Sequence, residues 1–324
     1  MKKLGCMLMA VLMAVAVSGC SDKKEASENK ETEKKVTLIL DYLPNTNHTG
    51  FYVAKEKGFF KEEGLDVDII EPGDESTSAT LVAANKGEFG VSYQEDVTYA
   101  RTAEEPLPIR AIATIIQHNT SGFVSLKKEN IKSPKDFEGK VYAGWQAPSE
   151  EAVVKAVMTA AKADFSKLTM VGADGSGFAS LGKSVDIQWE FEGWAVTKGR
   201  MEGYDLKYIP LRELDERLDY YTPVIITSEK MIKEDPETVQ KFMNAVKKGY
   251  EYAIENPDAA AEILSKYAPD YDLKFLKESQ KYLSSEYARD ADSWGVMKDS
   301  VWDNYTAFMY ENKLITEKIK ADEQ

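Results

Sequence analysis

Polar side chains follow directly after a hydrophobic run near residue 40. The run from Val36 to Leu40 is β-branched and aliphatic, which is typical of a fully buried strand. Residues 41–50 then read DYLPNTNHTG, and the side chains in this stretch that could contact a ligand are Asp41, Tyr42, Asn45, Asn47 and His48. Open α/β sheets place such groups at the carboxyl edge of the sheet, where small molecules bind. The stretch therefore predicts one half of a binding site.

Aromatic and acidic residues gather at further predicted strand ends. The additional candidates are Tyr93, Gln94 and Glu95 at the end of the run 89–93, Trp145 at the end of 140–145, Gly175 and Ser176 in a glycine-rich turn, and Trp189, Glu190, Glu192 and Trp194 in the run 184–194. Asp96 adds a further carboxylate. Aromatic faces stack on planar rings, and carboxylates accept hydrogen bonds from amines. These residue types predict a site for a small polar molecule.

Simpler roles remain open for some of these side chains. Glu190 and Glu192 alternate on the expected strand, so they should point the same way, either into a cleft or toward water. Trp189 and Trp194 are five residues apart, so one of them could belong to the core. A lone histidine such as His48 often orients a loop instead of contacting ligand.

Strands and helices alternate along the chain in a way that predicts two α/β lobes. Strand-like runs at 36–40, 65–70, 89–93 and 109–116 are separated by helical patterns, and this spacing is typical of parallel sheets built from βαβ units. A second set of strands begins at 122, and the chain from Lys230 onward is almost entirely helical. We expect one lobe from residues 36–120 and 222–324 and a second from 121–221, with the polar strand ends of both lobes facing the ligand.

The N-terminal residues have the pattern of an exported lipoprotein. Two lysines precede an apolar run that is too short to span a bilayer, so residues 1–19 are expected to be a signal peptide. The sequence Val17-Ser18-Gly19-Cys20 resembles a lipobox, which would leave a lipid on Cys20. Residues 20–35 contain no large apolar side chain and are expected to be a flexible tether. The alternatives are an ordinary secreted protein and a solvated helix in place of the tether.

The formal net charge of −14 argues against nucleic acid as a partner and against electrostatic attachment to anionic lipid. The lipid on Cys20 would instead hold the protein on the outer side of the cytoplasmic membrane. Cys20 would be the only cysteine left after cleavage, so the core must stabilise the fold without a disulfide.

Several motifs together resemble the solute-binding proteins of bacterial ABC importers. They are the lipobox, the segment from Asp41 to Pro72, FGVSYQEDV, Gly144-Trp145 followed by Pro148-Ser149-Glu150-Glu151, and the segment from Glu234 to Ala260. The branch includes binders of alkanesulfonates, nitrate and thiamine pyrimidine precursors, and residues 41–50 are most similar to the last group. The resemblance implies a type II periplasmic-binding-protein-like fold in which two lobes close on a small molecule.

This resemblance implies that the protein captures hydroxymethylpyrimidine or formylaminopyrimidine and delivers it to a permease and its ATPase. It further implies that the protein is a monomer, binds no cofactor and is not an enzyme. The aromatic candidates would stack on the pyrimidine, and the carboxylates and amides would bind its edge. One departure concerns Ala195: pyrimidine-precursor binders usually have an acidic residue directly after the tryptophan that corresponds to Trp194. Another amine-bearing heterocycle, or a cationic compound, would also suit so acidic a site.

Three alternatives stay open at this point. A sulfonate or nitrate binder would need basic side chains or helix N-termini at the cleft, and the strand-end clusters contain no Lys or Arg. Eukaryotic relatives synthesise the pyrimidine with a cofactor-bearing lysine and an iron site, but this chain has Ser92 and Asp96 in the corresponding region. Its only histidines, His48 and His118, are seventy residues apart, so no metal cluster is expected. An adhesin or sensor lipoprotein is the third alternative.

Overall fold

The computed structural model describes residues 33–73 and 76–324. The predicted signal peptide (1–19), Cys20 and most of the predicted tether (20–35) lie outside these residues. Lys34 and Lys35 do not belong to a tether, because they form the start of strand β1 and pair with Leu65 and Asp66. No helix in the described ranges is long and apolar enough to cross a bilayer.

A five-stranded sheet with the order β2-β1-β3-β10-β4 contains the first set of predicted strands. Its strands are β1 (Lys34–Ile39), β2 (Leu65–Ile70), β3 (Phe89–Ser92), β4 (Ile109–Thr114) and β10 (Val224–Ser228). The β1 strand pairs in parallel with β2 and β3, but β10 is antiparallel to both β3 and β4. The prediction of a parallel sheet was wrong for β10. The chain leaves this sheet after β4, forms the second sheet, and returns so that β10 runs in the opposite direction to its neighbours.

The chain forms a second five-stranded sheet during that excursion, in the order β7-β6-β8-β5-β9. Its strands are β5 (Ser121–Leu126), β6 (Val141–Gly144), β7 (Thr169–Gly172), β8 (Ile187–Phe191) and β9 (Leu206–Pro210). The β6 strand is parallel to β7 and β8, whereas β5 is antiparallel to β8 and β9. This sheet is also mixed, and its antiparallel strand is the one that arrives from the first sheet.

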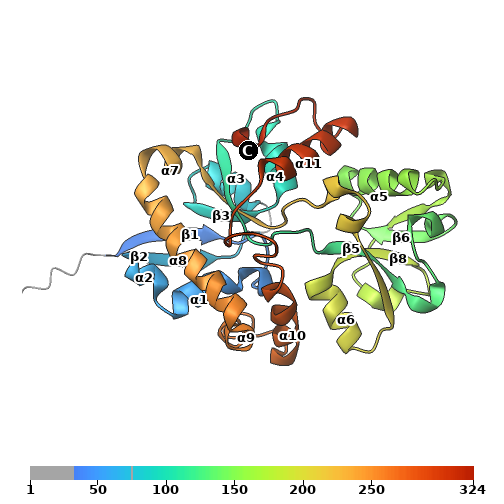
Figure 1. Ribbon diagram of the computed structural model, residues 1–324, viewed down its shortest axis with the longest axis horizontal. Helices are drawn as coiled ribbons and strands as arrows, with labels where there is room; N and C mark the ends of the chain where they lie inside the picture. Colours follow the sequence, from blue (N-terminus) through green and yellow to red (C-terminus); the bar gives the residue numbers. More distant parts are fainter. Residues whose placement is uncertain (1–32, 74–75) are drawn as a thin grey trace, which may run out of the picture. The chain divides into compact units, whose positions relative to one another are not determined.

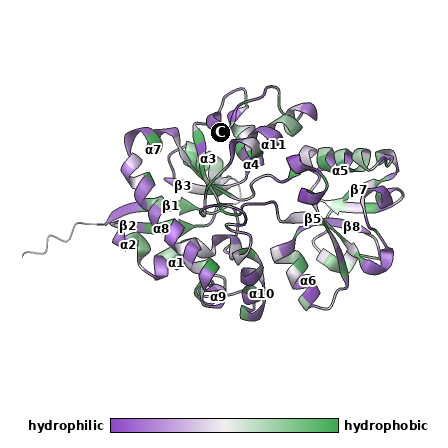
Figure 2. Cartoon of the chain, in the orientation of Figure 1, coloured by the Kyte–Doolittle hydropathy of each residue, from purple (hydrophilic) through white to green (hydrophobic). Residues whose placement is uncertain are grey.

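Helices cover the two sheets, and their bounds follow the hydrophobic periodicity of the sequence. They are α1 (Thr49–Glu56), α2 (Phe59–Glu62), α3 (Ser78–Ala83), α4 (Gln94–Arg101), α5 (Pro148–Ala160), α6 (Thr197–Met201), α7 (Glu229–Glu234), α8 (Pro236–Glu255), α9 (Pro257–Leu264), α10 (Leu273–Ser284) and α11 (Asp299–Glu311). Hydrophobic colour concentrates on interior strands such as β3, whereas the outer turns of α8 are hydrophilic (Figure 2). The predicted helical character of the region after Lys230 is confirmed.

Helix α8 packs against α1 and holds the segment 41–50 (Figure 1). The two helices touch through glycines: a Cβ atom on Gly249 would lie 2.0 Å from the carbonyl oxygen of Gly50, so no larger residue fits there. Next to this contact, the hydroxyl of the buried Tyr250 donates to the carbonyl oxygen of Asn47 at 2.6 Å. A segment two hundred residues away along the chain therefore fixes the backbone of the first candidate stretch.

The C-terminal helix α11 contacts the cores of both sheets. Trp302 packs in a cluster with Val224 and Ile226 of the first sheet, whereas Tyr305 and Phe308 pack in the core of the second. The sequence prediction placed all of 222–324 with the first lobe. Trp302 and Tyr305 lie one above the other on the same face of α11, so successive turns of this helix reach the two different cores.

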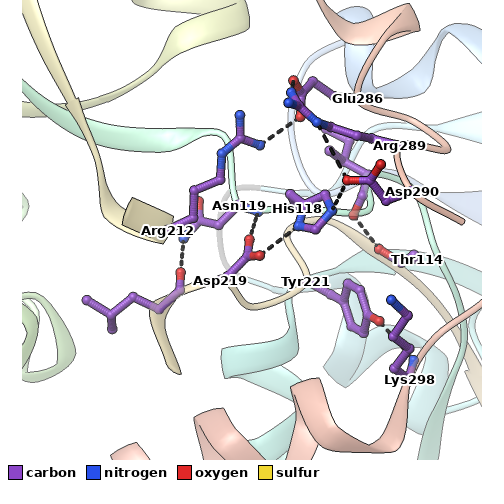
Figure 3. A network of polar contacts seen from close by, with 12 residues as sticks. Thr114, His118, Asn119, Arg212, Asp219, Tyr221, Glu286, Arg289, Asp290 and Lys298 are labelled. Carbon is purple, nitrogen blue, oxygen red and sulfur yellow. Dashed lines mark hydrogen bonds and ion pairs between the residues drawn. The ribbon is translucent and has the colours of Figure 1, made fainter. Parts of the chain in front are cut away.

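Polar residues bind the two connections between the sheets to each other (Figure 3). His118 Nδ1 lies 2.6 Å from a carboxylate oxygen of Asp219, and the backbone N–H of Asn119 donates to the other oxygen of the same carboxylate at 2.8 Å. Beside them, Arg212 donates to the buried Glu286 at 2.7 Å. This network fixes the outgoing connection near 118–119 against the returning one near 219.

Candidate functional site

Two adjoining cavities lie where the carboxyl ends of strands from both sheets meet. The first, of about 230 Å³, is lined by Asp41, Tyr42, Asn45, Thr46, Asn47, Tyr93, Thr120, Phe191, Gly193, Trp194, Thr222 and Leu283. The second, of about 330 Å³, is lined by Tyr93, Glu95, Asp96, Ser121, Trp145, Trp189, Phe191, Tyr220 and Thr222. Tyr93, Phe191 and Thr222 line both cavities. We call the two cavities the first and second compartments and their union the cleft.

Asp41 is the central acid of the first compartment. Its side chain is 5% exposed; one carboxylate oxygen lies 2.6 Å from His48 Nε2, and the other accepts from the hydroxyl of Tyr93 at 2.5 Å. Burial alone would raise the pKa of Asp41, but the attraction and hydrogen bond of His48, together with the Tyr93 hydroxyl, hold this pKa below its usual range. Asp41 is therefore a carboxylate at neutral pH and can accept a hydrogen bond from an amine.

His48 contacts the carboxylate of Asp41 but does not line either compartment. The imidazole is fully buried, and its Nδ1 accepts from the backbone N–H of Asn45 at 3.2 Å. Because Nδ1 is an acceptor, Nε2 carries the hydrogen and donates it to Asp41. In this structure the histidine orients its loop, which is the simpler of the two roles that the sequence left open.

The loop of the first compartment is rigid before any ligand arrives. The Asn45 side chain accepts from the backbone N–H of Asn47 at 2.8 Å, which caps the short 3₁₀ turn Thr46–His48. The hydroxyl of the buried Tyr287 donates to the carbonyl oxygen of Thr46 at 2.5 Å. Amide groups of Asn45 and Asn47 line the compartment and offer both donors and acceptors to a ring edge.

Two tryptophans form a wall of the second compartment. The rings of Trp145 and Trp189 lie 5.0 Å apart between centroids at an angle of 54°. Trp145 is 56% exposed, so much of its face is open, whereas Trp189 is only 7% exposed. The indole Nε1–H of Trp189 is buried and has no hydrogen-bond partner in the described part of the chain. This nitrogen has almost no accessible surface, so Trp189 contributes its ring and not its donor to the wall.

Glu150 positions Trp145 through the backbone. This buried carboxylate accepts from the N–H groups of Trp145 and Gln146, at 3.2 Å and 2.6 Å, and from the hydroxyl of Tyr142 at 2.6 Å. A Cβ atom on Gly144 would lie 1.6 Å from Glu150, so the motif Gly144-Trp145 requires its glycine. The sequence analysis named Glu150 only within the motif Pro148-Ser149-Glu150-Glu151, and its spacing from Trp145 was the signal for this role.

The first turn of α4 brings two carboxylates to the second compartment. Glu95 accepts from Ser149 at 2.8 Å and from the hydroxyl of Tyr305 at 2.7 Å. The carboxylate of Asp96 makes no hydrogen bond or ion pair within the part of the chain that the structure describes. Burial, and then the charges of Glu95 and Asp41, raise the pKa of Asp96 to about 6.

The sequence analysis predicted a single strand over the run 184–194, and this prediction was wrong. Strand β8 ends at Phe191, and a π-helical turn follows from Glu192 to Val196. The turn is held from outside, because the hydroxyl of Ser279 in α10 donates to the carbonyl oxygen of Gly193 at 2.5 Å. After this turn Trp194 lines the first compartment. Its ring packs edge-to-face with the rings of Tyr271 and Phe275, with centroid distances of 4.8 Å and 4.7 Å.

The expectation that Glu190 and Glu192 point the same way is wrong for the same reason. Glu192 binds Arg200 and Tyr282, both at 3.1 Å. Glu190 lines a separate cavity of about 250 Å³ together with Gly175 and Ser176. Burial raises the pKa of Glu190 to about 7 there. Neither glutamate nor the glycine-rich turn lines the cleft.

The structure brings most of the other predicted residues together. Of the candidates, the cleft is lined by Asp41, Tyr42, Asn45, Asn47, Tyr93, Glu95, Trp145, Trp189 and Trp194. Gln94 lies outside it, since its buried side chain accepts from the backbone N–H of Tyr221 and donates to the carbonyl oxygen of Val301.

The sequence interpretation missed the cleft residues that come from the two connections between the sheets, namely Thr120, Ser121, Tyr220 and Thr222. It also missed Phe191. The aromatic pair Tyr220-Tyr221 just before the returning strand was the available signal. Ser92 Oγ, which ends the strand before Tyr93, is buried without a partner among the described residues, and it does not line the cleft.

The lining of the cleft contains no Lys or Arg among the described residues. Groups of three or more His, Cys, Asp or Glu that could hold a metal ion are also absent from residues 33–73 and 76–324. The cleft therefore combines aromatic walls, three carboxylates and amide groups. This combination favours an aromatic molecule that donates hydrogen bonds or carries positive charge.

Comparison with known proteins gives one family and one fold. Residues 45–260 match the model of the family described as NMT1/THI5 like. The formylaminopyrimidine-binding protein of Halalkalibacterium halodurans is 28% identical over 281 residues, which cover 85% of this chain and 82% of that protein. The 4-amino-5-hydroxymethyl-2-methylpyrimidine phosphate synthase THI13 of Saccharomyces cerevisiae is 24% identical over 283 residues, or 80% of each chain.

Among solved structures, the alkanesulfonate-binding protein SsuA from Xanthomonas axonopodis pv. citri, bound to MOPS, superposes with a TM-score of 0.66. The match covers 89% of this chain and 96% of that protein, at 11% sequence identity. At this identity the likeness concerns the fold alone. It confirms the predicted periplasmic-binding-protein-like architecture.

Proposed function

The chain belongs to the NMT1/THI5-like family, and on this premise we propose that it is the solute-binding component of an ABC importer for a thiamine pyrimidine precursor. The solute is hydroxymethylpyrimidine or formylaminopyrimidine, which the protein binds in the cleft and delivers to a permease and its ATPase. In this proposal the protein is exported and is held at the outer side of the cytoplasmic membrane by a lipid on Cys20.

The observation that carries this proposal is the ionised Asp41 in an aromatic compartment. An aminopyrimidine is planar and carries an exocyclic amine. Its ring would stack between Tyr42, Phe191 and Trp194, all of which line the first compartment, and its amine would donate to Asp41. A stacked aromatic pair contributes about 0.5 to 1.5 kcal/mol beyond area burial, and a hydrogen bond to a charged group contributes about 1.5 to 3 kcal/mol.

Binding would also couple the two sheets. Asp41 and Tyr42 follow β1 of the first sheet, whereas Phe191 and Trp194 follow β8 of the second. A ligand that contacts both groups favours the arrangement in which they are close, because only differential contact shifts a conformational equilibrium. The connections joined by His118, Asn119 and Asp219 would be the place where the two sheets move relative to each other (Figure 3).

The two rival functions fit the cleft less well. A sulfonate or nitrate would face Asp41, Glu95 and Asp96 without a compensating Lys or Arg in the described lining, so like charges would repel. A pyrimidine synthase of the type named among the relatives would need a lysine for a cofactor Schiff base, and the described lining has none.

Calorimetry and thermal unfolding with a small panel of solutes test the proposal. Hydroxymethylpyrimidine and formylaminopyrimidine should bind and raise the melting temperature, since a ligand at a hundred times its Kd stabilises the folded state by about 2.7 kcal/mol. Taurine and nitrate should do neither. Stabilisation by taurine with no effect of either pyrimidine would overturn the ligand assignment in favour of an anion binder.

A further inference from the structure

Several hydroxyl groups line the first compartment, and two of them are buried without a partner. The residues that carry these hydroxyl groups are Tyr42, Thr46, Tyr93, Thr120 and Thr222. The hydroxyl of Thr46 lies 2.6 Å from that of Ser279, and Tyr42 is exposed. Tyr93 already donates its hydrogen to Asp41. Thr120 and Thr222 are 3% and 5% exposed, and neither hydroxyl makes a hydrogen bond within the described part of the chain.

The hydroxyl groups of these two threonines can be reached from the compartment. Ser92 shows the contrasting case, because its Oγ atom has neither a partner among the described residues nor accessible surface. The oxygens of Thr120 and Thr222 are not sealed in this way, and both residues line the compartment. Either hydroxyl can therefore rotate its hydrogen toward a bound solute.

The backbone on both sides of Thr222 is bound to the first sheet. The N–H of Tyr221 donates to the side-chain oxygen of Gln94 at 2.8 Å. The carbonyl oxygen of Pro223 accepts from the N–H of Ile115 at 3.0 Å. The position of Thr222 relative to Asp41 is therefore fixed within one sheet and does not depend on how the two sheets approach each other.

Thr120, in contrast, is bound to the second sheet. Its carbonyl oxygen accepts from the N–H of Glu192 at 2.9 Å and from the hydroxyl of Tyr208 at 2.7 Å. Its distance from Asp41 changes whenever the two sheets move. Of the two free hydroxyl groups, that of Thr222 is the one that forms a fixed pair with the carboxylate.

Thr222 and Asp41 lie at the same edge of the first sheet. In the strand order β1-β3-β10, Asp41 follows β1, and Thr222 comes shortly before β10, which runs in the opposite direction. Neighbouring strands are about 4.8 Å apart, so these two positions are separated by roughly 10 Å. A six-membered ring with an amine, and with a hydrogen bond at each side, spans roughly this distance.

The two groups differ in hydrogen-bonding character. Asp41 is ionised at neutral pH and can only accept, so it selects the exocyclic amine of a ring. An unprotonated ring nitrogen also can only accept, so it needs a donor on the protein. Thr222 offers this donor, and no described residue competes for it.

A β-branched residue suits the position of Thr222 for a simpler reason as well. The residue before a proline favours an extended backbone, and a side chain branched at Cβ fits that conformation. Valine would meet this requirement as well as threonine does. The backbone therefore accounts for the branch at Cβ, but it does not account for the hydroxyl.

We propose that Thr222 is a specificity-determining residue, whose hydroxyl donates a hydrogen bond to a ring nitrogen of the bound aminopyrimidine. This inference rests on the proposed function, because it places the pyrimidine in the first compartment with its amine on Asp41. The pair selects a ring in which an amine and an unprotonated nitrogen occur together. It disfavours a pyrimidinone, since a carbonyl oxygen in place of the amine would face the carboxylate.

Two probes of nearly the same shape isolate the ring nitrogens. One is hydroxymethylpyrimidine, and the other is its benzene analogue, in which carbon replaces both ring nitrogens and the amine, methyl and hydroxymethyl groups stay. Calorimetric titration at pH 8, where the ring nitrogens carry no proton, gives a Kd for each. The ratio of the two constants reports the contribution of the nitrogens, because contacts to the shared substituents cancel.

Three variants assign this contribution to the hydroxyl. Thr222→Val removes the hydroxyl and keeps the branch at Cβ, and the preference for the pyrimidine should fall by roughly three- to thirtyfold. Thr222→Ser keeps the hydroxyl and should keep the wild-type ratio. Thr169→Val makes the same change at an exposed position of β7 and should also keep it. Thermal unfolding checks that each variant is folded.

A ratio unchanged in Thr222→Val, or one that falls equally in Thr169→Val, would overturn the inference. If the ratio is unchanged while hydroxymethylpyrimidine binds the wild-type protein, the inference about Thr222 fails and the proposed function stands. If neither hydroxymethylpyrimidine nor formylaminopyrimidine binds the wild-type protein, the proposed function itself fails. The result that supports both is binding of the pyrimidine with a preference that is lost in Thr222→Val and kept in Thr222→Ser.

Discussion

The two compartments of the cleft differ in how completely Asp41 of the first and Asp96 of the second are paired. In the first, Asp41 is bound by His48 and Tyr93, and the backbone around it is fixed by Asn45, Tyr250 and other groups. In the second, Asp96 and the N–H of Trp189 have no partners among the described residues. The central acid of the first compartment is thus paired within the protein, whereas these two groups of the second are not.

The same difference explains why two carboxyl groups in one cleft have opposite pKa shifts. Burial raises the pKa of both acids. At Asp41 two hydrogen-bond donors outweigh this effect, but at Asp96 the neighbouring charges of Glu95 and Asp41 add to it. Asp41 is therefore ionised throughout the physiological range, and Asp96 changes its charge near pH 6.

Among the substitutions that test the difference between the two compartments, Asp41→Asn should weaken solute binding the most. The amide cannot accept from both His48 and Tyr93 and from the ligand amine, and a hydrogen bond to a charged group contributes about 1.5 to 3 kcal/mol. We expect hydroxymethylpyrimidine to bind roughly ten- to a hundredfold more weakly, and the melting temperature to fall because a buried donor loses its partner. Calorimetry and thermal unfolding measure the two effects, with Asp66→Asn as the control. An unchanged Kd would show that the first compartment does not hold the amine.

Trp145→Ala should weaken binding of formylaminopyrimidine by roughly three- to thirtyfold if the solute reaches the second compartment, since a ring face that contributes about 0.5 to 2 kcal/mol is lost. The fold should be little affected because the side chain is more exposed than buried. Fluorescence or calorimetric titration measures the loss, and circular dichroism checks the fold. A Kd for formylaminopyrimidine equal to that of the wild type would remove Trp145 from the binding surface.

Lowering the pH should weaken binding of a cationic solute in the cleft and not that of a neutral solute of the same shape. The groups that act on Asp96 are Glu95 and Asp41, and with its pKa near 6 Asp96 is ionised above pH 7 and mostly neutral at pH 5. The attraction for a cation is therefore present at high pH and is lost as the pH falls through 6, by at most about tenfold. Titrations at pH 7.5 and pH 5 test this with thiamine, whose thiazolium ring is cationic, and with 3-deazathiamine, whose corresponding ring is neutral. A parallel decline for both probes would assign the pH dependence to another group.

Tyr93→Phe should have the smallest effect. It removes one hydrogen bond to Asp41 but keeps the ring that lines both compartments, and a hydrogen bond of this kind contributes about 1 kcal/mol net. We expect binding of hydroxymethylpyrimidine to weaken by roughly fivefold at pH 7 and a rise in the pKa of Asp41. A loss as large as that in Asp41→Asn would mean that the hydroxyl contacts the ligand directly.

Local patterns in the sequence were sufficient for much of the fold. The runs 65–70, 89–93 and 109–116 form strands, and the region after Lys230 is helical. These elements depend on which faces are apolar, and this property is written in the spacing of residues. Pairing direction is not local, so the antiparallel β10 and β5 could not be inferred from βαβ spacing.

Residues 41–50 show what the sequence by itself determined about the site. A buried strand followed by Asp41, Asn45 and Asn47 predicted a half-site, and these residues line the first compartment. They lie together because a strand end places its following residues at the edge of the sheet whatever the rest of the chain does, and their contact with a ligand stays a prediction.

Residues 189–194 show what only the tertiary structure decided. The alternation of Glu190 and Glu192 predicted one strand face, but contacts from α10 hold a π-helical turn after Phe191, and the two glutamates diverge. Likewise, the pairing of Asp41 with Tyr93 and the lack of a partner for Asp96 depend on segments that meet only after folding. Residue types and their order thus predicted which groups could bind a ligand. The three-dimensional packing decided which of them are satisfied internally and which line the cleft without such a partner among the described residues.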